Sequence, residues 1–378
     1  MQAGFREQPL PSWRRAVLKV GSSLLAPDGG MLSDRHAAGL ARFVSASLAA
    51  GREVVVVSSG AVAAGRPLVG ARSERSAGIA ARQALAALGQ TRLIALWQGF
   101  FSQPVAQVLL THDDLRNRRR YLNARSTLRE LLALGAIPVI NENDTVAVDE
   151  LTLGDNDNLA AIVAALVDAD LLLIASDIGG LYTANPRTDA GARPLDEVGA
   201  VTAGIMAMAG GTGSRAGTGG MLTKLEAAQK AAAAGIETIL FDGTDAGVVG
   251  LLANGCFRGT RLSASRTRLA ARKYWLRHAP AVGGGILIDE GAAAALSSRG
   301  ASLLPGGVLA ADGDFARGDM VEIYLDRERR IHIGRGVTQY AAVDIRRIAR
   351  RHTREIESIL GYSYGENVVH RDDLVACE

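Results

Sequence analysis

The stretch VVVVSSG, residues 54–60, sets four consecutive valines directly before two serines and a glycine. An apolar run without polar alternation predicts a strand that is buried on both faces, as in a parallel sheet covered by helices. The segment AVLKVGSS (16–23) has the same form, because its apolar run also ends in glycine and hydroxyl side chains. Between the two, residues 34–50 carry apolar side chains at helical spacing on one face. These segments indicate an α/β fold.

The alternation of helix and strand continues along the chain to about residue 245. Helices are expected over 121–134, 157–167 and 222–234, each followed by a strand, over 136–140, 171–175 and 238–241. Polar residues come directly after each of these strands. Open α/β sheets bind their ligands beyond the carboxyl ends of their strands, so we expect the functional site at that edge.

The pattern changes after residue 265. A basic, helix-like segment leads to a break at Pro280 and Gly283–Gly285, and the short alternating runs that follow (286–288, 320–325 and 331–333) predict a small β-rich domain. The chain therefore divides into a loose N-terminal extension (1–15), an α/β catalytic domain (16–265), a connector (266–281) and a β-rich domain with a C-terminal tail (282–378).

The composition limits the class of protein. The 378 residues are 48% hydrophobic and 21% charged, which is a globular balance and excludes a wholly disordered chain. Two cysteines, Cys256 and Cys377, make neither a disulfide framework nor a zinc site. The N-terminus has no apolar signal region, and no apolar run is long enough to span a bilayer. We therefore expect a cytoplasmic protein that is neither secreted nor membrane-embedded.

Lysine is rare in this chain and therefore informative. Only four of the 42 basic residues are lysines. Lys19 shortly precedes a glycine and two serines, and Lys224 shortly follows a glycine-rich segment. In KVGSS (19–23), an ammonium at a strand end lies beside free backbone N–H groups, which suits a phosphate. In GTGGMLTK (217–224), glycines let the backbone approach a polyphosphate at a helix N-terminus. The alternatives are a strand-end lysine before an ordinary turn and a flexible glycine linker.

Two clusters of carboxylates and carboxamides follow strands or open helices. NEND (141–144) follows an expected strand, and GDNDN (154–158) precedes an expected helix that it could cap. The same groups could hold an amino group, orient lysines or bind Mg²⁺. No histidine pair has metal-ligand spacing, and no nucleophile motif is present in the sequence. Phosphate-type glycines, isolated lysines and acidic clusters together point to phosphoryl transfer.

In their order and spacing, these motifs resemble the amino acid kinase family, and within it the glutamate 5-kinases. The resemblance rests on KVGSS (19–23), VVVVSSGAVAAG (54–65), PVINENDTV (138–146), GDNDNLAA (154–161), SDIGGLYTANP (176–186) and GTGGMLTK (217–224). DEGAAAAL (289–296), LLPGGV (303–308), FARGDMVEI (315–323) and ILGYSYGENVVHRDDL (359–374) resemble the PUA domain that follows the kinase domain in many members.

The resemblance implies a fold and a reaction. The fold would be a mostly parallel, eight-stranded sheet between helices, followed by the β-rich PUA domain. The reaction would transfer the γ-phosphate of ATP to the γ-carboxylate of L-glutamate with the help of Mg²⁺, as the first step of proline biosynthesis. The resemblance further implies a homo-oligomer, feedback inhibition by proline and glutamyl phosphate reductase as a partner.

The resemblance also implies roles for individual residues. Lys19 and Lys224 would flank the transferred phosphoryl group, and Asp155 would hold both lysines in place. The residues that bind glutamate would be Ser59, Asp144 and Asn156, with Asn141 and Asp157 nearby. The ATP site would be lined by Lys19, Ser176, Asp177, Thr218, Gly219, Gly220, Met221, Leu222, Thr223 and Lys224. No side chain is assigned as a metal ligand.

Two alternatives remain at this point. The first is another amino acid kinase, acting on acetylglutamate or aspartate, against which the NENDTV and GDNDN clusters and the PUA-like segment argue. The second is an RNA-binding regulator that uses the PUA domain beside a degenerate kinase. The retained Lys19, Lys224 and Asp155 argue against degeneracy. A net charge of only +3 and an aromatic content of 4% permit contact with nucleic acid without implying strong binding to RNA.

Overall fold

The computed structural model describes residues 4–27, 31–70, 78–147, 156–209, 220–264, 284–325 and 331–376. The chain forms two compact units. Unit 1 comprises Met1–Asn117 and Asn123–Arg268, and unit 2 comprises Arg118–Leu122 and Leu269–Glu378. The expected connector, 266–281, lies outside the described residues. In the part of the chain that is described, no helix has the length and apolar character needed to cross a membrane.

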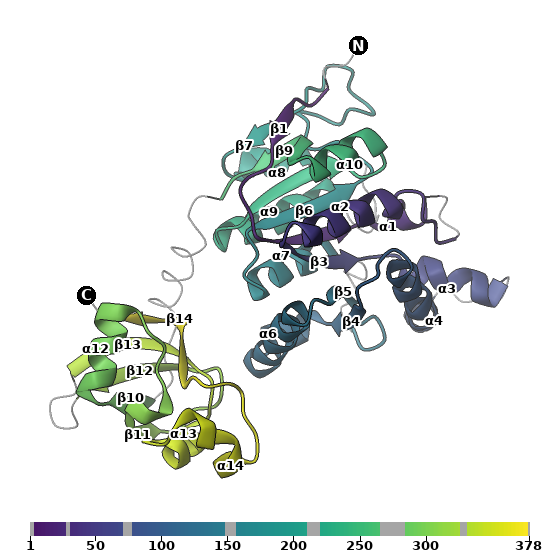
Figure 1. Ribbon diagram of the computed structural model, residues 1–378. Coiled ribbons are helices and arrows are strands. Elements are labelled where there is room, and N and C mark those ends of the chain that lie inside the picture. Colours follow the sequence, from purple (N-terminus) through teal and green to yellow (C-terminus); the bar gives the residue numbers. More distant parts are fainter. Residues whose placement is uncertain are drawn as a thin grey trace. The chain divides into compact units, whose positions relative to one another are not determined.

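Unit 1 contains a nine-stranded sheet in the order β1-β9-β8-β6-β2-β3-β5-β4, with β7 paired to β9 (Figure 1). From β8 to β4 every neighbouring pair is parallel, whereas β9 runs antiparallel to β8 and β1 antiparallel to β9. The mostly parallel fold is as expected, and the two-residue β7 makes nine strands where eight were expected. The strands are β1 (Glu7–Pro9), β2 (Arg15–Val20), β3 (Glu53–Ser58), β4 (Val105–Leu110), β5 (Ile137–Glu142), β6 (Leu171–Ser176), β7 (Glu197–Val198), β8 (Glu237–Asp242) and β9 (Cys256–Leu262).

The helices that connect these strands belong to unit 1, except that the helix beginning at Arg118 has its first five residues in unit 2. Those expected over 34–50, 121–134, 157–167 and 222–234 are observed with shifted ends, whereas the others, α3 and α4 among them, were not expected. The helices are α1 (Ser22–Leu25), α2 (Ala37–Ala49), α3 (Ala61–Val69), α4 (Ile79–Gln98), α5 (His112–Arg116), α6 (Arg118–Ala133), α7 (Asn156–Leu166), α8 (Ala203–Ala209), α9 (Met221–Ala233) and α10 (Ala246–Ala253).

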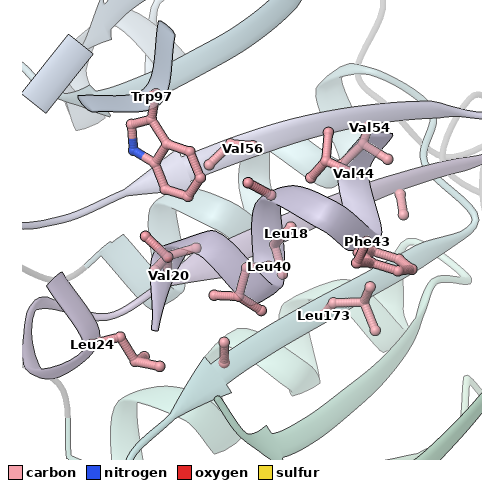
Figure 2. Packing of buried hydrophobic residues seen from close by; sticks show 14 of the residues in the cluster. Leu18, Val20, Leu24, Leu40, Phe43, Val44, Val54, Val56, Trp97 and Leu173 are labelled. Carbon is pink, nitrogen blue, oxygen red and sulfur yellow. The ribbon is translucent and has the colours of Figure 1, made fainter. Parts of the chain in front are cut away.

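Alternation along the central strands decides which face each side chain reaches. Leu18 and Val20 of β2, with Val54 and Val56 of β3, join a core with residues of α2, α4 and α10 (Figure 2). Successive side chains of a strand point to opposite faces, so Lys19 belongs to the other face of the sheet. Helix α7 packs against β2, β3 and β6. Because side chains alternate between the two faces of the sheet, Lys19 points away from this core.

The N-terminal segment is ordered rather than loose. Strand β1 pairs with β9 in the register Glu7 to Arg258, and the backbone N–H of Arg14 donates to Asp170 Oδ2 at 2.9 Å. The backbone N–H of Arg6 likewise donates to Asp196. The expectation of a loose extension is wrong because β9 would otherwise leave a row of unpaired backbone groups at the edge of the sheet.

Unit 2 contains a five-stranded sheet in the order β11-β10-β12-β13-β14. The three strands expected here are observed, and β11 and β14 are added to them. The strands are β10 (Gly284–Ile288), β11 (Val308–Gly313), β12 (Met320–Leu325), β13 (Ile331–Thr338) and β14 (Val369–Ala376), and the helices are α12 (Glu290–Arg299), α13 (Ala342–Ile348) and α14 (Ile356–Leu360), with short 3₁₀ turns at Pro305–Gly307 and Thr353–Glu355. One apolar core joins this sheet to its helices, which gives unit 2 a core of its own.

Candidate functional site

The candidate site lies at the carboxyl ends of four neighbouring strands, where polar residues follow apolar ones. Lys19 is the penultimate residue of β2, Ser59 directly follows β3, Asn141 lies near the end of β5, and Ser176 ends β6. The sheet order extends from β2 toward β3 and β5 on one side and toward β6 and β8 on the other. Ligands of open α/β sheets bind at such a reversal of strand order.

Two buried lysines converge on one carboxylate at this edge. Lys19 Nζ lies 2.6 Å from Asp157 Oδ1, and Lys224 Nζ lies 3.2 Å from Asp157 Oδ2. The side chain of Asp157 is 0% exposed and each lysine side chain is 5% exposed. Asp157 belongs to the first turn of α7, which packs on the face of the sheet toward which Lys19 points. We call Lys19, Asp157 and Lys224 the lysine cluster.

The electrostatics of the lysine cluster favour an anionic ligand. Burial by itself would raise the pKa of Asp157, but the charges of Lys19 and Lys224 hold it below its usual value of 3.8. Burial lowers the pKa of Lys224, and the nearby carboxylates of Asp157 and Asp177 oppose this effect. Among the described residues, the two buried ammonium groups share a single buried carboxylate, that of Asp157, in a place from which water is largely excluded. A phosphate or a carboxylate group would be a further anionic partner for these ammonium groups.

Helix α9 directs its N-terminus toward the same cluster. Its first residues are Met221 and the exposed Leu222, and its N-cap residue, Gly220, has no side chain to cap the first turn. Thr223 Oγ1 lies 2.8 Å from both Asp157 Oδ2 and the carbonyl oxygen of Gly220, which ties the helix start to the cluster. A Cβ atom on Gly220 would meet no atom of the described residues within 4 Å. Backbone N–H groups at a helix N-terminus beside a buried ammonium suit a polyphosphate.

Asn156 joins the lysine cluster to a second group of polar side chains. Its Nδ2 lies 2.9 Å from Ser59 Oγ, 2.9 Å from Asn141 Oδ1 and 3.2 Å from the carbonyl oxygen of Ser58. Its Oδ1 is buried and has no hydrogen-bond partner among the described residues. A buried acceptor without a partner is costly, so Oδ1 is suited to accept a hydrogen bond from a ligand N–H group. We call Ser59, Asn141 and Asn156 the amide cluster.

Asp144 lies in the turn after β5, three residues beyond Asn141 of the amide cluster. Burial raises its pKa from 3.8 to about 6, and the guanidinium charge of Arg82 partly opposes the shift. A carboxylate that burial destabilises gains most from a cationic ligand. Asp144 therefore suits a ligand that carries an ammonium group.

The residues expected in the nucleotide site divide into described and undescribed ones. Ser176 is buried. The next residue, Asp177, is exposed, and its Oδ2 atom lies 3.4 Å from Arg187 Nη2. Asp177 lies close enough to Lys224 to influence its pKa, which brings it near the lysine cluster. Thr218 and Gly219 lie outside the described residues.

The role expected for Asp155 stays a prediction, and a second aspartate is found at the lysine cluster. Asp155 was expected to hold both lysines, but it lies outside the described residues. Among the residues that the structure describes, the carboxylate between the lysines is that of Asp157, which was expected beside the glutamate site. The reason is local, since α7 begins at Asn156 and its first turn directs Asp157 toward β2 while Asn156 meets the amide cluster.

Sequence reasoning missed three residues near the site, all on α4. Arg82 acts on Asp144, Gln90 Oε1 accepts a hydrogen bond of 3.1 Å from Asn141 Nδ2, and Trp97 Nε1 donates at 2.9 Å to Ser58 Oγ. The available signal was a glutamine and a tryptophan seven positions apart, on the face that the helix buries. This signal alone does not say which strand ends the helix will reach.

Comparisons with known proteins agree with this geometry. The sequence model of the amino acid kinase family matches residues 14–242, and that of the PUA domain matches residues 284–360. The chain belongs to the amino acid kinase family.

Within that family, the chain is similar to proteins named glutamate 5-kinase. Its identity is 72% to the one from Xanthomonas oryzae pv. oryzae (strain KACC10331 / KXO85) and 73% to the one from Xanthomonas campestris pv. campestris (strain 8004), in each case over 95% of this chain and 99% of the relative. The glutamate 5-kinase of Xylella fastidiosa (strain M23) is 65% identical over 98% of this chain and 97% of the relative.

Proposed function

We propose that this protein transfers the γ-phosphoryl group of ATP to the γ-carboxylate of L-glutamate and so forms γ-glutamyl phosphate, the first step of proline biosynthesis. The lysine cluster carries the proposal, because it lies between the N-terminus of α9 and the amide cluster. One side of it suits a polyphosphate, and the other suits a ligand with an ammonium group. The similarity to glutamate 5-kinases supports the same substrates.

The proposed step needs charge neutralisation more than proton transfer. The side-chain carboxylate of glutamate is ionised at pH 7, so it can attack the γ-phosphorus without a general base. One of its oxygens forms the new P–O bond, the bond from the γ-phosphorus to the bridging oxygen breaks, and ADP leaves with that electron pair. Repulsion between two anions is the obstacle, and Lys19 and Lys224 reduce it from a preorganised, water-poor position.

The carboxylates near the lysine cluster are compatible with a magnesium ion that binds together with the nucleotide. Both oxygens of Asp157 already meet a lysine, and the described residues hold no group of three or more His, Cys, Asp or Glu side chains placed to bind a metal. Mg²⁺ commonly binds substrate phosphates and water together with one or two carboxylates. When bound, it supplies further charge neutralisation at the phosphates, and the exposed carboxylate of Asp177, which is close enough to Lys224 to influence its pKa, is available on the proposed nucleotide side.

The same similarity motivates four finer expectations. The enzyme would act in the cytoplasm as a homo-oligomer, proline would inhibit it, and glutamyl phosphate reductase would consume its labile product. The four rest on the resemblance to glutamate 5-kinases and not on a contact within this chain.

The test is acyl phosphate formation by the purified full-length chain. ATP is supplied with L-glutamate, N-acetylglutamate or L-aspartate, and hydroxylamine traps any acyl phosphate as a hydroxamate. We expect a hydroxamate with glutamate and far less with the other two acceptors. Equal turnover of acetylglutamate, or no product from glutamate, would contradict the proposal. The Lys224→Ala variant, purified in the same way, controls for contaminating kinases.

A further inference from the structure

One face of helix α4 reaches two of the strand ends that build the amide cluster. Gln90 and Trp97 are seven residues apart, so at 100° per residue their side chains lie within about 20° of each other around the helix axis. Trp97 is fully buried and Gln90 is 7% exposed. Gln90 meets Asn141 at the end of β5, and Trp97 meets Ser58 at the end of β3.

The contact of Gln90 determines how the amide of Asn141 is turned. Asn141 Nδ2 donates to Gln90 Oε1 at 3.1 Å, which leaves Asn141 Oδ1 to accept on its other side. The backbone N–H of Glu142, which can only donate, meets that oxygen at 2.9 Å, and Asn156 Nδ2 meets it at the same distance. The orientation of one amide therefore dictates that of the next.

The contact of Trp97 holds the side chain of Ser58, a residue whose backbone carbonyl oxygen also meets Asn156. The indole N–H can only donate, so Ser58 Oγ accepts from it at 2.9 Å, and the Ser58 hydroxyl lies 3.1 Å from the carbonyl oxygen of Ser59, to which it donates. Figure 2 shows Trp97 beside the apolar core, near Val56 of β3, with its indole nitrogen in blue. The neighbouring carbonyl oxygen of Ser58 in turn accepts from Asn156 Nδ2.

Both contacts lead to the same result at Asn156. With Nδ2 facing Asn141 Oδ1 and the carbonyl oxygen of Ser58, the Asn156 Oδ1 atom is held on the opposite side of its amide group. That atom is buried and has no partner among the described residues. A flip of the Asn156 amide would set its oxygen against two acceptors, at the cost of two hydrogen bonds.

We propose that Gln90 and Trp97 are positioning residues for the acceptor, which through Asn141 and Ser58 hold Asn156 Oδ1 ready to accept a hydrogen bond from the ammonium group of the amino acid. This inference rests on the proposed function and adds to it the residues that determine recognition of the acceptor. Neither side chain is assigned to contact the substrate. Because both act through residues at the amide cluster, we expect them to affect binding of the amino acid and not binding of ATP.

The central experiment removes the Gln90 acceptor while keeping a side chain of similar length. In Gln90→Met, the loss of one buried hydrogen bond should raise the KM for glutamate about 5- to 100-fold and leave the KM for ATP within about twofold. Gln90→Glu should restore a KM near that of the wild type. It keeps an acceptor oxygen, burial favours its neutral form, and Gln90 Nε2 has no partner among the described residues that the change would remove.

A second variant tests the other contact, and a third provides the control. Trp97→Phe keeps an aromatic ring but removes the N–H donor, and it should raise the KM for glutamate in the same direction. Gln98→Met removes a glutamine of the same helix that bonds at 3.1 Å to the carbonyl oxygens of Phe101 and Gln103, away from the amide cluster. It should leave both KM values unchanged.

A double-mutant cycle separates positioning from general loosening of the site. In an Asn156→Ala background the amide that Gln90 orients is absent, so adding Gln90→Met should change the KM for glutamate by less than about twofold. Additive effects, equal increases in both KM values, or an equal effect of Gln98→Met would overturn the inference. So would an unchanged glutamate KM in both Gln90→Met and Trp97→Phe.

The outcomes also distinguish this inference from the proposed function. If the wild-type chain forms no acyl phosphate from glutamate, the proposed function falls. If the wild type does so but Gln90→Met and Trp97→Phe keep its KM for glutamate, only the role of α4 falls. Should Gln90→Met not fold, Trp97→Phe and its combination with Asn156→Ala carry the same test.

Discussion

Lys19 and Lys224 are the residues on which the proposed chemistry depends most directly. Each forms an ion pair with Asp157, and replacing either one by alanine would remove an ammonium group from the water-poor centre of the site. We expect Lys19→Ala and Lys224→Ala each to lower kcat on the order of 10²–10³-fold, by analogy with loss of one preorganised donor. Steady-state kinetics measure this, and near-normal turnover in either variant would contradict the two-lysine mechanism. Arginine at either position should also fail, since a planar guanidinium cannot replace a compact ammonium there.

Asp157 offers a test of which aspartate holds the lysines. Asp157→Asn leaves two buried ammonium groups without their shared counter-charge, and breaking a buried ion pair typically costs about 3–5 kcal/mol of unfolding free energy. Because its pKa lies below 3.8, wild-type Asp157 stabilises the fold above about pH 4 and loses that effect as the pH falls further. Urea unfolding at pH 7 measures the loss. An equal loss in Asp155→Asn, with Asp157→Asn unaffected, would return the bridging role to Asp155.

Asp144 should couple substrate affinity to pH. With a pKa raised to about 6, it is ionised at pH 7.5 and can pair with an ammonium group, whereas below pH 6 it becomes neutral. We expect kcat/KM for glutamate to fall as the pH drops through 6, and Asp144→Asn to abolish this titration. The variant should also raise the KM for glutamate strongly and that for ATP only slightly, and it should narrow the preference for glutamate over acetylglutamate.

The stability of the Asp144 variant provides an independent check. Between pH 3.8 and 6 the folded chain binds more protons at Asp144 than the unfolded chain does, so this group destabilises the fold as the pH rises through that window. Above pH 6, Asp144→Asn should therefore raise the unfolding free energy, by roughly 1–3 kcal/mol. A variant that is less stable at pH 8, or an unchanged glutamate KM, would show that Asp144 is not a strained carboxylate waiting for an ammonium group.

At the scale of elements, the close approach of α3 and α4 determines where α4 places Gln90, next to the amide cluster. Gly65 and Gly89 lie where the two helices touch, and a Cβ atom on Gly89 would come within 1.9 Å of the carbonyl oxygen of Ala61. No side chain fits there, because the obstacle is backbone rather than a movable side chain. The separation of the helices is thus determined by glycine, and Gln90 is the next residue along α4.

Gly89→Ala should displace α4 and so disturb both stability and recognition. Overpacking of this kind costs about 1–3 kcal/mol, and the displaced Gln90 should raise the KM for glutamate more than that for ATP. Gly99→Ala is the matched control at the end of the same helix, because its Cβ atom would lie 3.4 Å from the nearest oxygens. Thermal unfolding and the two KM values measure the outcome. If both variants behave like the wild type, α4 does not depend on this contact.

At the scale of the whole molecule, the two units have separate cores. The core of unit 2 is built from its own sheet and helices, and all described residues of the candidate site belong to unit 1. We expect a chain truncated after Arg268 to fold and to keep kinase activity of the same order as the full-length chain. Size-exclusion chromatography, thermal unfolding and the hydroxamate assay test this together. An insoluble or inactive truncated chain would show that unit 1 depends on unit 2.

Much of the site could be anticipated from the sequence because it follows regular elements. Ser59, Asn141 and Lys19 each come at or just after the end of an apolar strand, and parallel strands bring such ends to one edge. Gln90 and Trp97 could not be anticipated in this way. They lie on α4, a helix that was not expected, and their partners are 51 and 39 positions away in sequence.

The sequence by itself determined the α/β class, the parallel core strands, the edge that carries the site and the two lysines, since apolar runs, helical spacing and glycine contexts are local properties. Only the tertiary structure decided that Asp157 lies between the lysines, that Asn156 Oδ1 remains without a described partner, and that β1 closes the edge at β9. Each of these depends on distances between segments far apart along the chain. Those distances are set by the packing of α7, α4 and the sheet, because no local pattern encodes which side chains a buried helix will meet.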